Sequence, residues 1–596
     1  MPIVAISVKE LNRLLGKEFS RDELVDALEQ LGCDVEDTAE LGLFLCPTCK
    51  TPNDKLLTED PPRRCDFCGF EQDVPFEKVA TDRVIRLDLL AARPDLFDVG
   101  GLSRALKGYL GREQGLSRFE VGESDIVVNV DPKLSEKGTY RPFIVCAVVE
   151  MPPIDHGRLR DIMKLQENLH WGIGRDRKLA SIGVYHLDVI QSPITYTTVD
   201  PLTFKFCPLG MPGVQITPKQ ILEEHPKGMA YAHLMENYRR YPLLQDAQGL
   251  VLSMPPIINS EETKLEIGSS RFFIDITGIT RDAVVKSLDT LVSSLAELGG
   301  QVKNVQMNYP DRTARTPDLK PGTIEIKYEA ARRWLGINFS REEFIRNLRK
   351  MRLDVEPKGD VYLVSYPAFR TDIKHEVDVF EDLAIGYGYK NIETTLVPTM
   401  TIGESRLEEL LSQQVRQALL GLDFMEIMSL HLQSVERHFD KHLQESADQH
   451  VIVENPKTIE QKVVRTHLRT GIMETFQKNR RKAVPQKIFE IGNVIHLQPA
   501  KETGTAEYRH VAFAIIGPEA GYAEGRAVMD ALLHEIQRTV EYIPESHPSF
   551  SEGRCARLRG TNGTWGLLGE LHPQVLNNFG LSFPVVLGEL RLMQVI

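Results

Sequence analysis

The stretch YPAFRTDIKHEVDVFEDLAIGYGY, residues 366–389, is the most informative part of this 596-residue chain. Pro367 and its aromatic neighbours predict a short extended segment, after which Asp372 has the residue type of a helix N-cap. Gly386 and Gly388 are expected to end the helix, because glycine tolerates the positive φ of a C-terminal cap. Apolar residues at helical spacing predict one buried stripe, formed by Ile373, Val377, Phe380 and Ala384.

Acidic side chains lie beside this predicted stripe. Asp378, Glu381 and Asp382 have i, i+3 and i+4 spacing and therefore share one helix face, with Asp372 at its N-terminal end. Magnesium takes carboxylate oxygens together with waters or phosphates, so these four acids are candidates for a magnesium site. The alternative is an acidic first turn favoured by the helix macrodipole, followed by a solvated face. The spacing alone favours this alternative, because such acidic faces are common.

The full string is more specific than the spacing. It resembles the signature of the phenylalanine–tRNA ligase beta subunit family, R-x-D-I-x-x-E-x-D-x-x-E-[ED]-x-x-x-x-Y-G-Y-x-N-I. The resemblance implies that the acids at Asp372, Asp378, Glu381 and Asp382 bind magnesium shared with an alpha subunit. The matching residues are Arg370, Asp372, Ile373, Glu376, Asp378, Glu381, Asp382, Tyr387, Gly388, Tyr389, Asn391 and Ile392.

Composition bounds the class of protein. The chain is 42% hydrophobic and 26% charged, which is typical of a soluble globular protein, and its length predicts about three to five domains. It has no run of about 18 apolar residues and no signal-peptide pattern at its N-terminus, so we expect a cytoplasmic protein without a membrane partner. The net charge of −13 argues against a broad nucleic-acid-coating surface. A local RNA contact, or RNA held mainly by a partner subunit, stays open.

Four of the eight cysteines form two tight pairs, Cys46 with Cys49 and Cys65 with Cys68. The spacing C-x2-C-x15-C-x2-C predicts a tetrahedral structural zinc site, because each pair directs two thiolates at one ion. Four cysteine ligands leave no coordination position for catalysis. The alternative is four reduced thiols in a disordered insertion. This segment departs from the core pattern of the family, and we expect an insertion whose contacts are RNA or another subunit.

A short pattern occurs twice, with Leu15-Gly16 and Leu335-Gly336 separated by 320 residues. Ser20 and Glu23 form an S-x-x-E capping box in the first copy, and the same box recurs at Ser340 in the second. The repetition predicts that one small helical module is duplicated in the chain.

Residues from about 120 to 310 have the pattern of a mixed α/β region. This region resembles the editing domain of the archaeal and eukaryotic beta subunit, through the strings IGVYHLD (182–188) and LSMPPIIN (252–259), although His186 stands where the family leads us to expect Asp. The resemblance implies hydrolysis of tyrosyl-tRNA, which needs a positioned water and a pocket that hydrogen-bonds the tyrosine hydroxyl. For each candidate, the alternative is a strand-end or turn residue satisfied locally. The candidates for the polar lining are Ser253, Asn259, Asp275 and Thr277.

From about residue 400 the chain resembles the class II synthetase fold, an antiparallel sheet with flanking helices. Its landmarks include Arg465 and the string FEIG at 489–492. In active sites of this class an arginine just beyond that strand holds the ATP α-phosphate, whereas residues 493–497 contain none. A Gly-x-Gly-x-x-x-Arg segment is also missing near the C-terminus. Because adenylyl transfer needs that positive charge, we expect a non-catalytic domain that builds the subunit interface.

We therefore predict a multidomain α+β protein with duplicated small helical modules. The resemblance implies a cytoplasmic heterotetramer of two alpha and two beta subunits that attaches phenylalanine to tRNA, with ATP as substrate and Mg2+ as cofactor. The expected domains are 1–118 with a zinc-ribbon insertion at 45–70, an α/β editing domain at 119–312, a helical magnesium-binding module at 318–395, and a class II synthetase-like, non-catalytic antiparallel-sheet domain at 396–596.

Two other interpretations compete with this one. The first is a zinc-ribbon scaffold paralogue that binds RNA or protein and takes no part in aminoacylation. The intact acidic string and the LSMPPIIN segment argue against it, because a repurposed scaffold has no reason to keep them. The second is a synthetase active by itself, which the missing arginine disfavours.

Overall fold

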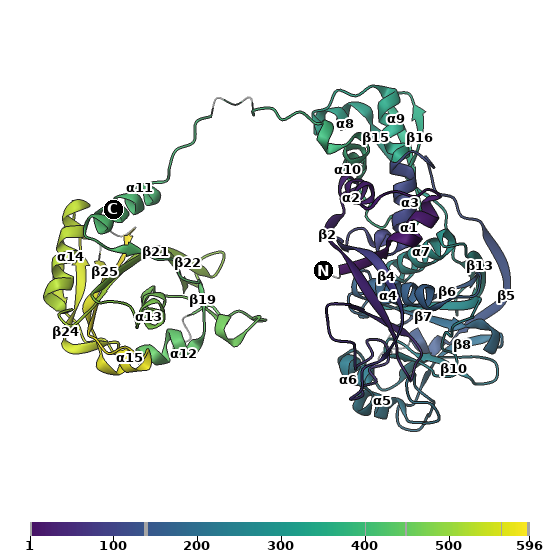
Figure 1. Cartoon of the computed structure of the whole chain (residues 1–596), viewed down its shortest axis with the longest axis horizontal. Helices are drawn as coiled ribbons and strands as arrows, with labels where there is room; N and C mark the ends of the chain where they lie inside the picture. Colours follow the sequence, from purple (N-terminus) through teal and green to yellow (C-terminus); the bar gives the residue numbers. More distant parts are fainter. Residues whose placement is uncertain are drawn as a thin grey trace. The chain divides into compact units, whose positions relative to one another are not determined.

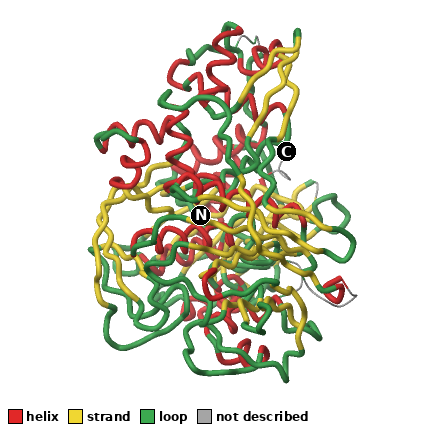
Figure 2. The backbone as a smooth tube through the Cα atoms, turned by 90° about the vertical axis from the view of Figure 1, so that its right-hand side faces the viewer, coloured by secondary structure: helices red, strands yellow, loops and turns green. Residues whose placement is uncertain are grey.

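The computed structural model describes residues 3–135, 141–397, 399, 401–446, 450–561 and 563–592. The chain divides into two compact units, Met1–Thr395 and Leu396–Ile596, which are described separately (Figure 1). Helices and strands are mixed throughout the chain (Figure 2). In the described ranges, every helix is too short or too polar to cross a membrane.

The first unit begins with a four-stranded antiparallel sheet in the order β1-β4-β2-β3. Ser20 and Glu23 form the predicted capping box at the start of α2, and Gly16 ends α1 with φ 65°. The strands are β1 Ile3–Ser7, β2 Asp34–Leu45, β3 Pro52–Leu56 and β4 Glu77–Asp88, and the helices are α1 Val8–Leu15, α2 Arg21–Gln30 and α3 Val99–Tyr109.

A ten-stranded mixed sheet forms the centre of the first unit, in the order β11-β10-β9-β8-β5-β13-β6-β12-β7, with β14 paired to β13. Its strands are β5 Val121–Val130, β6 Phe143–Glu150, β7 Ala180–His186, β8 Ile194–Val199, β9 Tyr241–Gln245, β10 Val251–Met254, β11 Ile258–Asn259, β12 Arg271–Gly278, β13 Gln301–Asn308 and β14 Thr313–Thr316. The helices of this region are α4 His156–Trp171, α5 Pro218–Glu224, α6 Pro226–Tyr231 and α7 Arg281–Glu297.

Strand β12 shows how this sheet is packed. It is hydrogen-bonded on both sides, to β6 and to β7, so its side chains must alternate between the two faces. Phe272, Ile274 and Ile276 pack with α4 and α7 in one apolar core, whereas Phe273 belongs to a second core on the opposite face. Asp275 is two residues beyond Phe273, so its side chain points to the same face of the sheet, away from α7.

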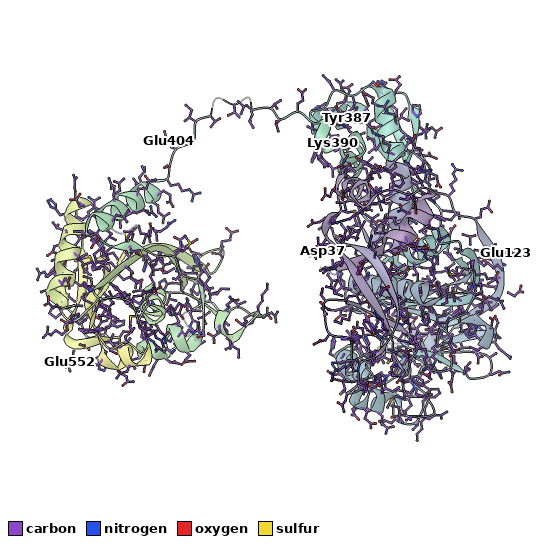
Figure 3. The ribbon with its side chains drawn as sticks, in the orientation of Figure 1. Asp37, Glu123, Tyr387, Lys390, Glu404 and Glu552 are labelled. Atoms are coloured by element: carbon purple, nitrogen blue, oxygen red, sulfur yellow. The ribbon has the colours of Figure 1, made fainter. Side chains whose placement is uncertain are left out.

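A three-stranded sheet, β15-β17-β16, carries the informative stretch. Gly336 ends α8 with φ 69°, and Ser340 and Glu343 form a second capping box at the start of α9, as the repeated pattern predicts. The strands are β15 Gly322–Lys327, β16 Asp354–Lys358 and β17 Val361–Tyr366, and the helices are α8 Tyr328–Leu335, α9 Arg341–Lys350 and α10 Glu376–Tyr387. Tyr387 and Lys390 are labelled where α10 ends (Figure 3).

The structure corrects three local predictions in this stretch. The N-cap of α10 is His375, not Asp372. The Asp378 carboxylate accepts hydrogen bonds from the backbone N–H groups of Lys374 and His375, which fixes the start of the helix there. Val377 is exposed and does not belong to the buried stripe. Only one of the two glycines ends the helix.

That glycine is Gly388, which caps α10 with φ 93°. Gly386 instead lies inside the helix, where a Cβ atom would overlap the backbone carbonyl of Asn347 in α9. Glycine at this position therefore serves close helix packing, a role that cannot be distinguished from a helix stop by sequence alone.

The second unit is a seven-stranded sheet in the order β18-β21-β22-β26-β25-β24-β23, antiparallel except between β18 and β21. On β22, Val511 and Phe513 face a core shared with α11 and α14, whereas Ala512 faces a core shared with α13 and α15. Helices thus cover both faces. The strands are β18 Met425–Glu426, β21 Gln486–Leu497, β22 Thr505–Ile516, β23 Glu541–Pro544, β24 Phe550–Gly560, β25 Gly563–Leu571 and β26 Val585–Arg591.

The helices of the second unit are α11 Leu407–Gly421, α12 Val435–His438, α13 Arg469–Lys478, α14 Tyr522–Glu535 and α15 Pro573–Asn578. A small separate pair of strands, β19 Leu432–Gln433 and β20 Val463–Val464, completes the unit.

The packing of α10 on α9 gives a direct test. Gly386→Ala should destabilise the first unit by about 1–3 kcal/mol, because the added methyl group collides with backbone that cannot rotate away. Gly157→Ala in α4 is the matched control, since its Cβ would lie 3.6 Å from an Asp155 carboxylate oxygen, an ordinary contact. Calorimetric unfolding of both variants measures the difference, and equal melting temperatures would contradict the packing role.

Candidate functional site

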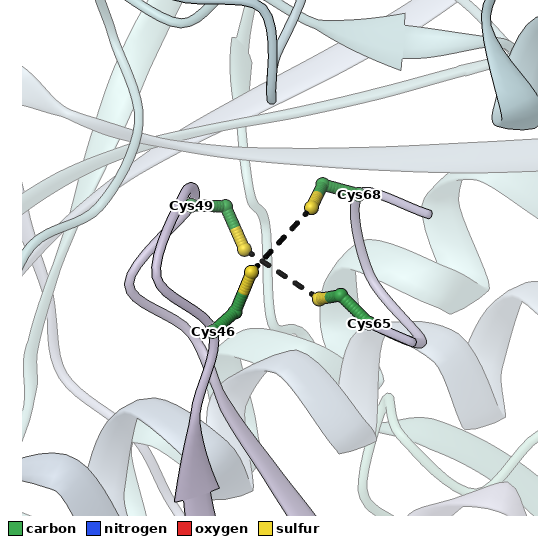
Figure 4. Close-up of side chains that lie close together, drawn as sticks. All are labelled: Cys46, Cys49, Cys65 and Cys68. Carbon is green, nitrogen blue, oxygen red and sulfur yellow. Dashed lines mark hydrogen bonds between the residues drawn. The ribbon is translucent and has the colours of Figure 1, made fainter. Parts of the chain in front are cut away.

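The four paired cysteines converge at one point (Figure 4). Cys46 Sγ lies 3.8 Å from Cys68 Sγ, and Cys49 Sγ lies 3.6 Å from Cys65 Sγ. A tetrahedral ion with Zn–S bonds of about 2.3 Å places its sulfurs about 3.8 Å apart, whereas a disulfide needs about 2.05 Å. All four cysteines are buried and unbridged. The geometry fits a four-thiolate zinc ion and not two disulfides.

The backbone around the cysteines forms two similar turns. In each turn the residue after the second cysteine has a positive φ, 60° at Lys50 and 79° at Gly69. The N–H of that residue donates to the carbonyl of the first cysteine of the pair. Asn53, itself buried, donates from Nδ2 to Cys65 Sγ at 3.5 Å. These backbone contacts by themselves direct both thiols of each pair toward one centre.

The four acids of the informative stretch are not gathered in the same way. Arg370 is buried and pairs with Asp372 at 2.6 Å and with Asp382 at 2.8 Å. Asp378 caps the N-terminus of α10, and Glu381 is exposed. Among the residues that the structure describes, the cysteines are the only cluster of three or more metal-binding side chains. The acids of this chain alone therefore do not form a preassembled magnesium cage.

The ion pairs of Arg370 act differently on the two carboxyl groups. Burial raises the pKa of Asp372, but the Arg370 guanidinium outweighs it and brings that pKa down to about 2. At Asp382, burial dominates over Arg370 and raises the pKa. Arg93 forms a similar two-bonded pair with Asp95 and adds to the field at Asp372. The Arg370–Asp372 and Arg93–Asp95 pairs thus belong to one buried charge cluster, which the sequence analysis did not predict.

Three of the four candidate editing residues lie in one pocket. Ser253 and Asn259 face each other across the β10–β11 pair, and Asp275 enters from the middle of β12. The Tyr185 hydroxyl hydrogen-bonds Ser253 Oγ at 2.8 Å and also Asp275 Oδ1. Gly183 of the IGVYHLD string makes room for this network, because any Cβ there would collide with the Tyr185 hydroxyl. The structure therefore joins two strings that are about 70 residues apart in sequence.

Asp275 has an unusual environment for a carboxyl group. Burial raises its pKa to about 7, against the opposing effects of the Tyr185 hydrogen bond and the Arg141 charge. Near neutral pH it is therefore present as both an acid and a carboxylate, and can donate or accept a hydrogen bond.

Thr277, the fourth candidate, lies beside the pocket and does not line it. Its hydroxyl accepts from Arg141 Nε at 3.2 Å and hydrogen-bonds Ser181 Oγ at 3.1 Å. Its carbonyl accepts from Arg141 Nη2 at 2.7 Å. Thr277 thus supports the end of β12 that carries Asp275, and its side chain does not line the pocket.

Helix α4 supplies pocket residues that sequence analysis missed: Gln166, Glu167 and His170. Gln166 donates to the carbonyl of Ile182, and His170 Nε2 accepts from the Ile182 N–H at 2.7 Å, so these side chains pair with the open edge of β7. Their helical spacing, i to i+4, was the only signal in the sequence.

Cations surround the Glu167 carboxylate on this side of the pocket, because Lys227 lines the pocket as well. Arg177 also lines it and contacts Glu167 at 2.7 Å. Burial raises the pKa of Glu167, but Arg177, His170 and Lys227 together outweigh it and lower that pKa well below its usual range. Burial lowers the pKa of His170, which keeps its ring neutral at neutral pH.

In the second unit, the landmark residues serve the fold. Arg465 and Glu490 of the FEIG string form a buried ion pair at 2.6 Å. A separate pocket of this unit contains Arg469, Arg591 and Glu589, and the buried Glu589 pairs with Arg469 at 3.7 Å and bonds His510 at 2.8 Å. Neither arginine lies in residues 493–497, just after the FEIG string, where an active class II site has the arginine that holds the ATP α-phosphate.

Comparison with known proteins places the chain among the tRNA synthetases. Residues 324–389 match the model of the tRNA synthetase B5 domain, and residues 392–592 match the phenylalanyl tRNA synthetase beta chain CLM domain. The phenylalanine–tRNA ligase beta subunit of Methanosphaera stadtmanae is 32% identical over the whole of both chains. That of Methanosarcina barkeri is 37% identical, over 86% of this chain and 92% of the relative. The chain belongs to the phenylalanine–tRNA ligase beta subunit family.

A solved structure supports the same relationship. The N-terminal fragment of the phenylalanyl-tRNA synthetase beta subunit from Pyrococcus horikoshii is 34% identical, with a TM-score of 0.56. The similarity covers 65% of this chain and 99% of the fragment.

The cysteine geometry predicts a measurable metal content. Purified protein should contain about one zinc per chain, and Cys65→Ser should lose most of it, because a four-thiolate site needs all its ligands. Cys33→Ser is the matched control, since Cys33 is an equally buried thiol outside the cluster. Metal analysis after gel filtration measures both variants. Full zinc retention in Cys65→Ser would contradict the site.

Proposed function

We propose that this chain is the beta subunit of a phenylalanine–tRNA ligase that contains two alpha and two beta subunits. With its alpha subunit it would attach L-phenylalanine to the cognate tRNA, using ATP and magnesium. The observation that carries this proposal is the match to beta subunits along the full length of the chain. The same match disfavours a scaffold paralogue, which would be free to lose one or more of the matched regions.

Aminoacylation is assigned to the alpha subunit. The strand after the FEIG string, residues 493–497, has no arginine for the ATP α-phosphate, and Arg465 is already committed to Glu490. Stabilising the charge on a transferring phosphoryl group requires such a cation at that place. The second unit is therefore proposed as a non-catalytic, class II-like domain that contributes the interface with the alpha subunit.

Hydrolytic editing of tyrosyl-tRNA is assigned to the pocket of the first unit. Ester hydrolysis needs a water directed at the carbonyl carbon and polar groups that discriminate tyrosine from phenylalanine by its hydroxyl. Ser253, Asn259 and Asp275 converge on one buried pocket and supply donors and acceptors for both tasks. Asp275, with its pKa of about 7, can accept a hydrogen bond from the phenolic O–H as a carboxylate or donate one to the phenolic oxygen as an acid.

Magnesium is proposed only as a site shared with the alpha subunit. Glu381 is exposed and Asp378 is half-buried at the edge of α10, so both can be approached from outside. Asp372 and Asp382 are held by Arg370 and would join the ion only if that pair opened. The remaining ligands would come from the partner, from water or from phosphate, as is usual for magnesium.

The domain boundaries predicted from the sequence remain proposals, as does the duplication of a helical module. The matched features are the Ser20 and Ser340 capping boxes, and Gly16 and Gly336, which both have φ between 65° and 69°. Zinc is proposed as a structural ion at the four cysteines, where it would stabilise two turns that lack a large apolar core.

The subunit assignment can be tested by co-expression with the cognate alpha chain. We expect a complex with about twice the combined mass of one alpha and one beta chain, as required by two copies of each. Phenylalanylation should need both chains, because neither would contain the whole enzyme. Light scattering and tRNA charging are the measurements. A beta chain that ignores alpha, or full activity from alpha alone, would contradict the assignment.

The editing assignment can be tested in the same complex. Asp275→Asn and Asn259→Ala should slow deacylation of tyrosyl-tRNA by about tenfold or more, since each removes a polar group of the pocket. Asp275→Asn should also flatten the dependence of the rate on pH near 7. Thr277→Val should have a smaller effect, because Thr277 only supports β12.

Asp289→Asn is the matched control for Asp275. Asp289 is a second buried carboxyl group whose pKa burial raises to about 7, but it lies on α7 outside the pocket. The Asp289→Asn substitution should leave the rate of tyrosyl-tRNA deacylation unchanged. Equal loss in both aspartate variants would mean that burial of the carboxyl group, and not its place in the pocket, accounts for the effect.

A further inference from the structure

The cysteine cluster and the editing pocket share a wall. Phe67 lies between Cys65 and Cys68 and lines the same pocket as Ser253 and Asp275. Its side chain is buried and belongs to the small apolar core of the ribbon. A segment that the sequence suggested would contact RNA or another subunit therefore contacts the proposed catalytic pocket of its own chain.

The ribbon core continues directly into the pocket lining. Met163 of α4 and Leu209 of the loop before α5 both pack against the cysteines and phenylalanines of the ribbon. Both residues also line the pocket. Next to Met163, Lys164 pairs with Asp54 of β3 at 2.7 Å and anchors the ribbon to α4.

The second cysteine turn fits closely against the start of α6 and against the loop before α5. A Cβ atom on Gly69 would lie 2.6 Å from Pro226 Cβ, and one on Gly210 would lie 3.0 Å from Cys68 Cβ. Both glycines have positive φ. Phe67 belongs to this turn, so any movement of residues 65–69 shifts Phe67 and must displace the loop or the start of α6.

The metal would hold this turn in place. Among the described residues, the buried members of the ribbon core are the four cysteines and three phenylalanines, Phe44, Phe67 and Phe76. A cluster this small does not order a chain segment by hydrophobic burial, and structural zinc sites supply that missing free energy themselves.

We propose that the zinc ribbon is a working part of the editing pocket: Phe67 forms a wall against the aromatic side chain of the misacylated amino acid, and zinc binding keeps that wall closed. The inference rests on the proposed editing function. The ligand class is an aromatic aminoacyl ester, because a buried phenylalanine ring offers offset or edge-to-face contact to another ring. Zinc occupancy then controls deacylation while leaving aminoacylation on the alpha subunit unaffected.

The first test uses Phe67→Ala in the complex with alpha. Tyrosyl-tRNA deacylation should fall by roughly tenfold, since one aromatic contact is lost and water enters the pocket. Zinc content and phenylalanylation should be unchanged. Phe76→Ala is the matched control, a buried phenylalanine of the same ribbon core that does not line the pocket. Equal deacylation by wild type and Phe67→Ala would overturn the role of Phe67.

The second test reports on the coupling without using activity. Hydrogen exchange is compared between the zinc-loaded complex, the chelated complex and the Cys65→Ser complex. Exchange should rise in the ribbon and also in residues 163–170 and 209–227, while α7 stays protected. Opening of residues 46–70 with no change in the pocket segments would overturn the coupling.

The two tests separate the failure of this inference from the failure of the proposed function. A wild-type complex that does not deacylate tyrosyl-tRNA would remove the editing function and with it the role of Phe67 toward substrate. Hydrogen exchange would still decide whether the ribbon holds the pocket. Active editing that survives both Phe67→Ala and chelation would leave the function intact and overturn the inference alone.

Discussion

The pairing of β12 on both of its edges is the constraint on which the first unit depends. A strand with two hydrogen-bonded neighbours cannot rotate about its own axis, so alternate side chains must face opposite sides of the sheet. Burial of Ile274 and Ile276 against α7 therefore forces Asp275 to the other side. There it loses its hydration, its pKa rises to about 7, and its hydrogen-bonding partner becomes the Tyr185 hydroxyl, which also bonds Ser253. One packing requirement thus produces the chemistry of the pocket.

Two other parts of the first unit depend on compensated burial of polar groups. Arg370 is buried only because two carboxyl groups share it, and removing either partner would leave a charge without compensation. The open edge of β7 is covered by the side chains of Gln166 and His170, which replace a missing strand partner. In both places, side chains of a kind often found in catalytic or metal sites, namely aspartate and histidine, also complete the hydrogen bonding of the fold.

The four-cysteine segment, residues 45–70, differs from these parts because its order comes from few apolar contacts. Its cysteine turns lie against Met163, Leu209 and Pro226, so the same contacts that seat the ribbon also shape the pocket. An inserted segment that supplies part of a pocket wall makes the pocket depend on the stability of the insertion. This dependence follows from shared packing and requires no long-range conformational change.

The sequence by itself determined the family, the two capping boxes and the four-cysteine cluster, because these depend on spacings of a few residues within one turn or one string. It also brought together Ser253, Asn259 and Asp275 as candidates, through resemblance. Only the tertiary structure decided that Asp372 pairs with Arg370 instead of capping α10, that Gly386 serves helix packing, and that Phe67 reaches the pocket. The physical reason is the same in each case. Which partner a polar or apolar group meets depends on residues far away in sequence, and local spacing carries no information about them.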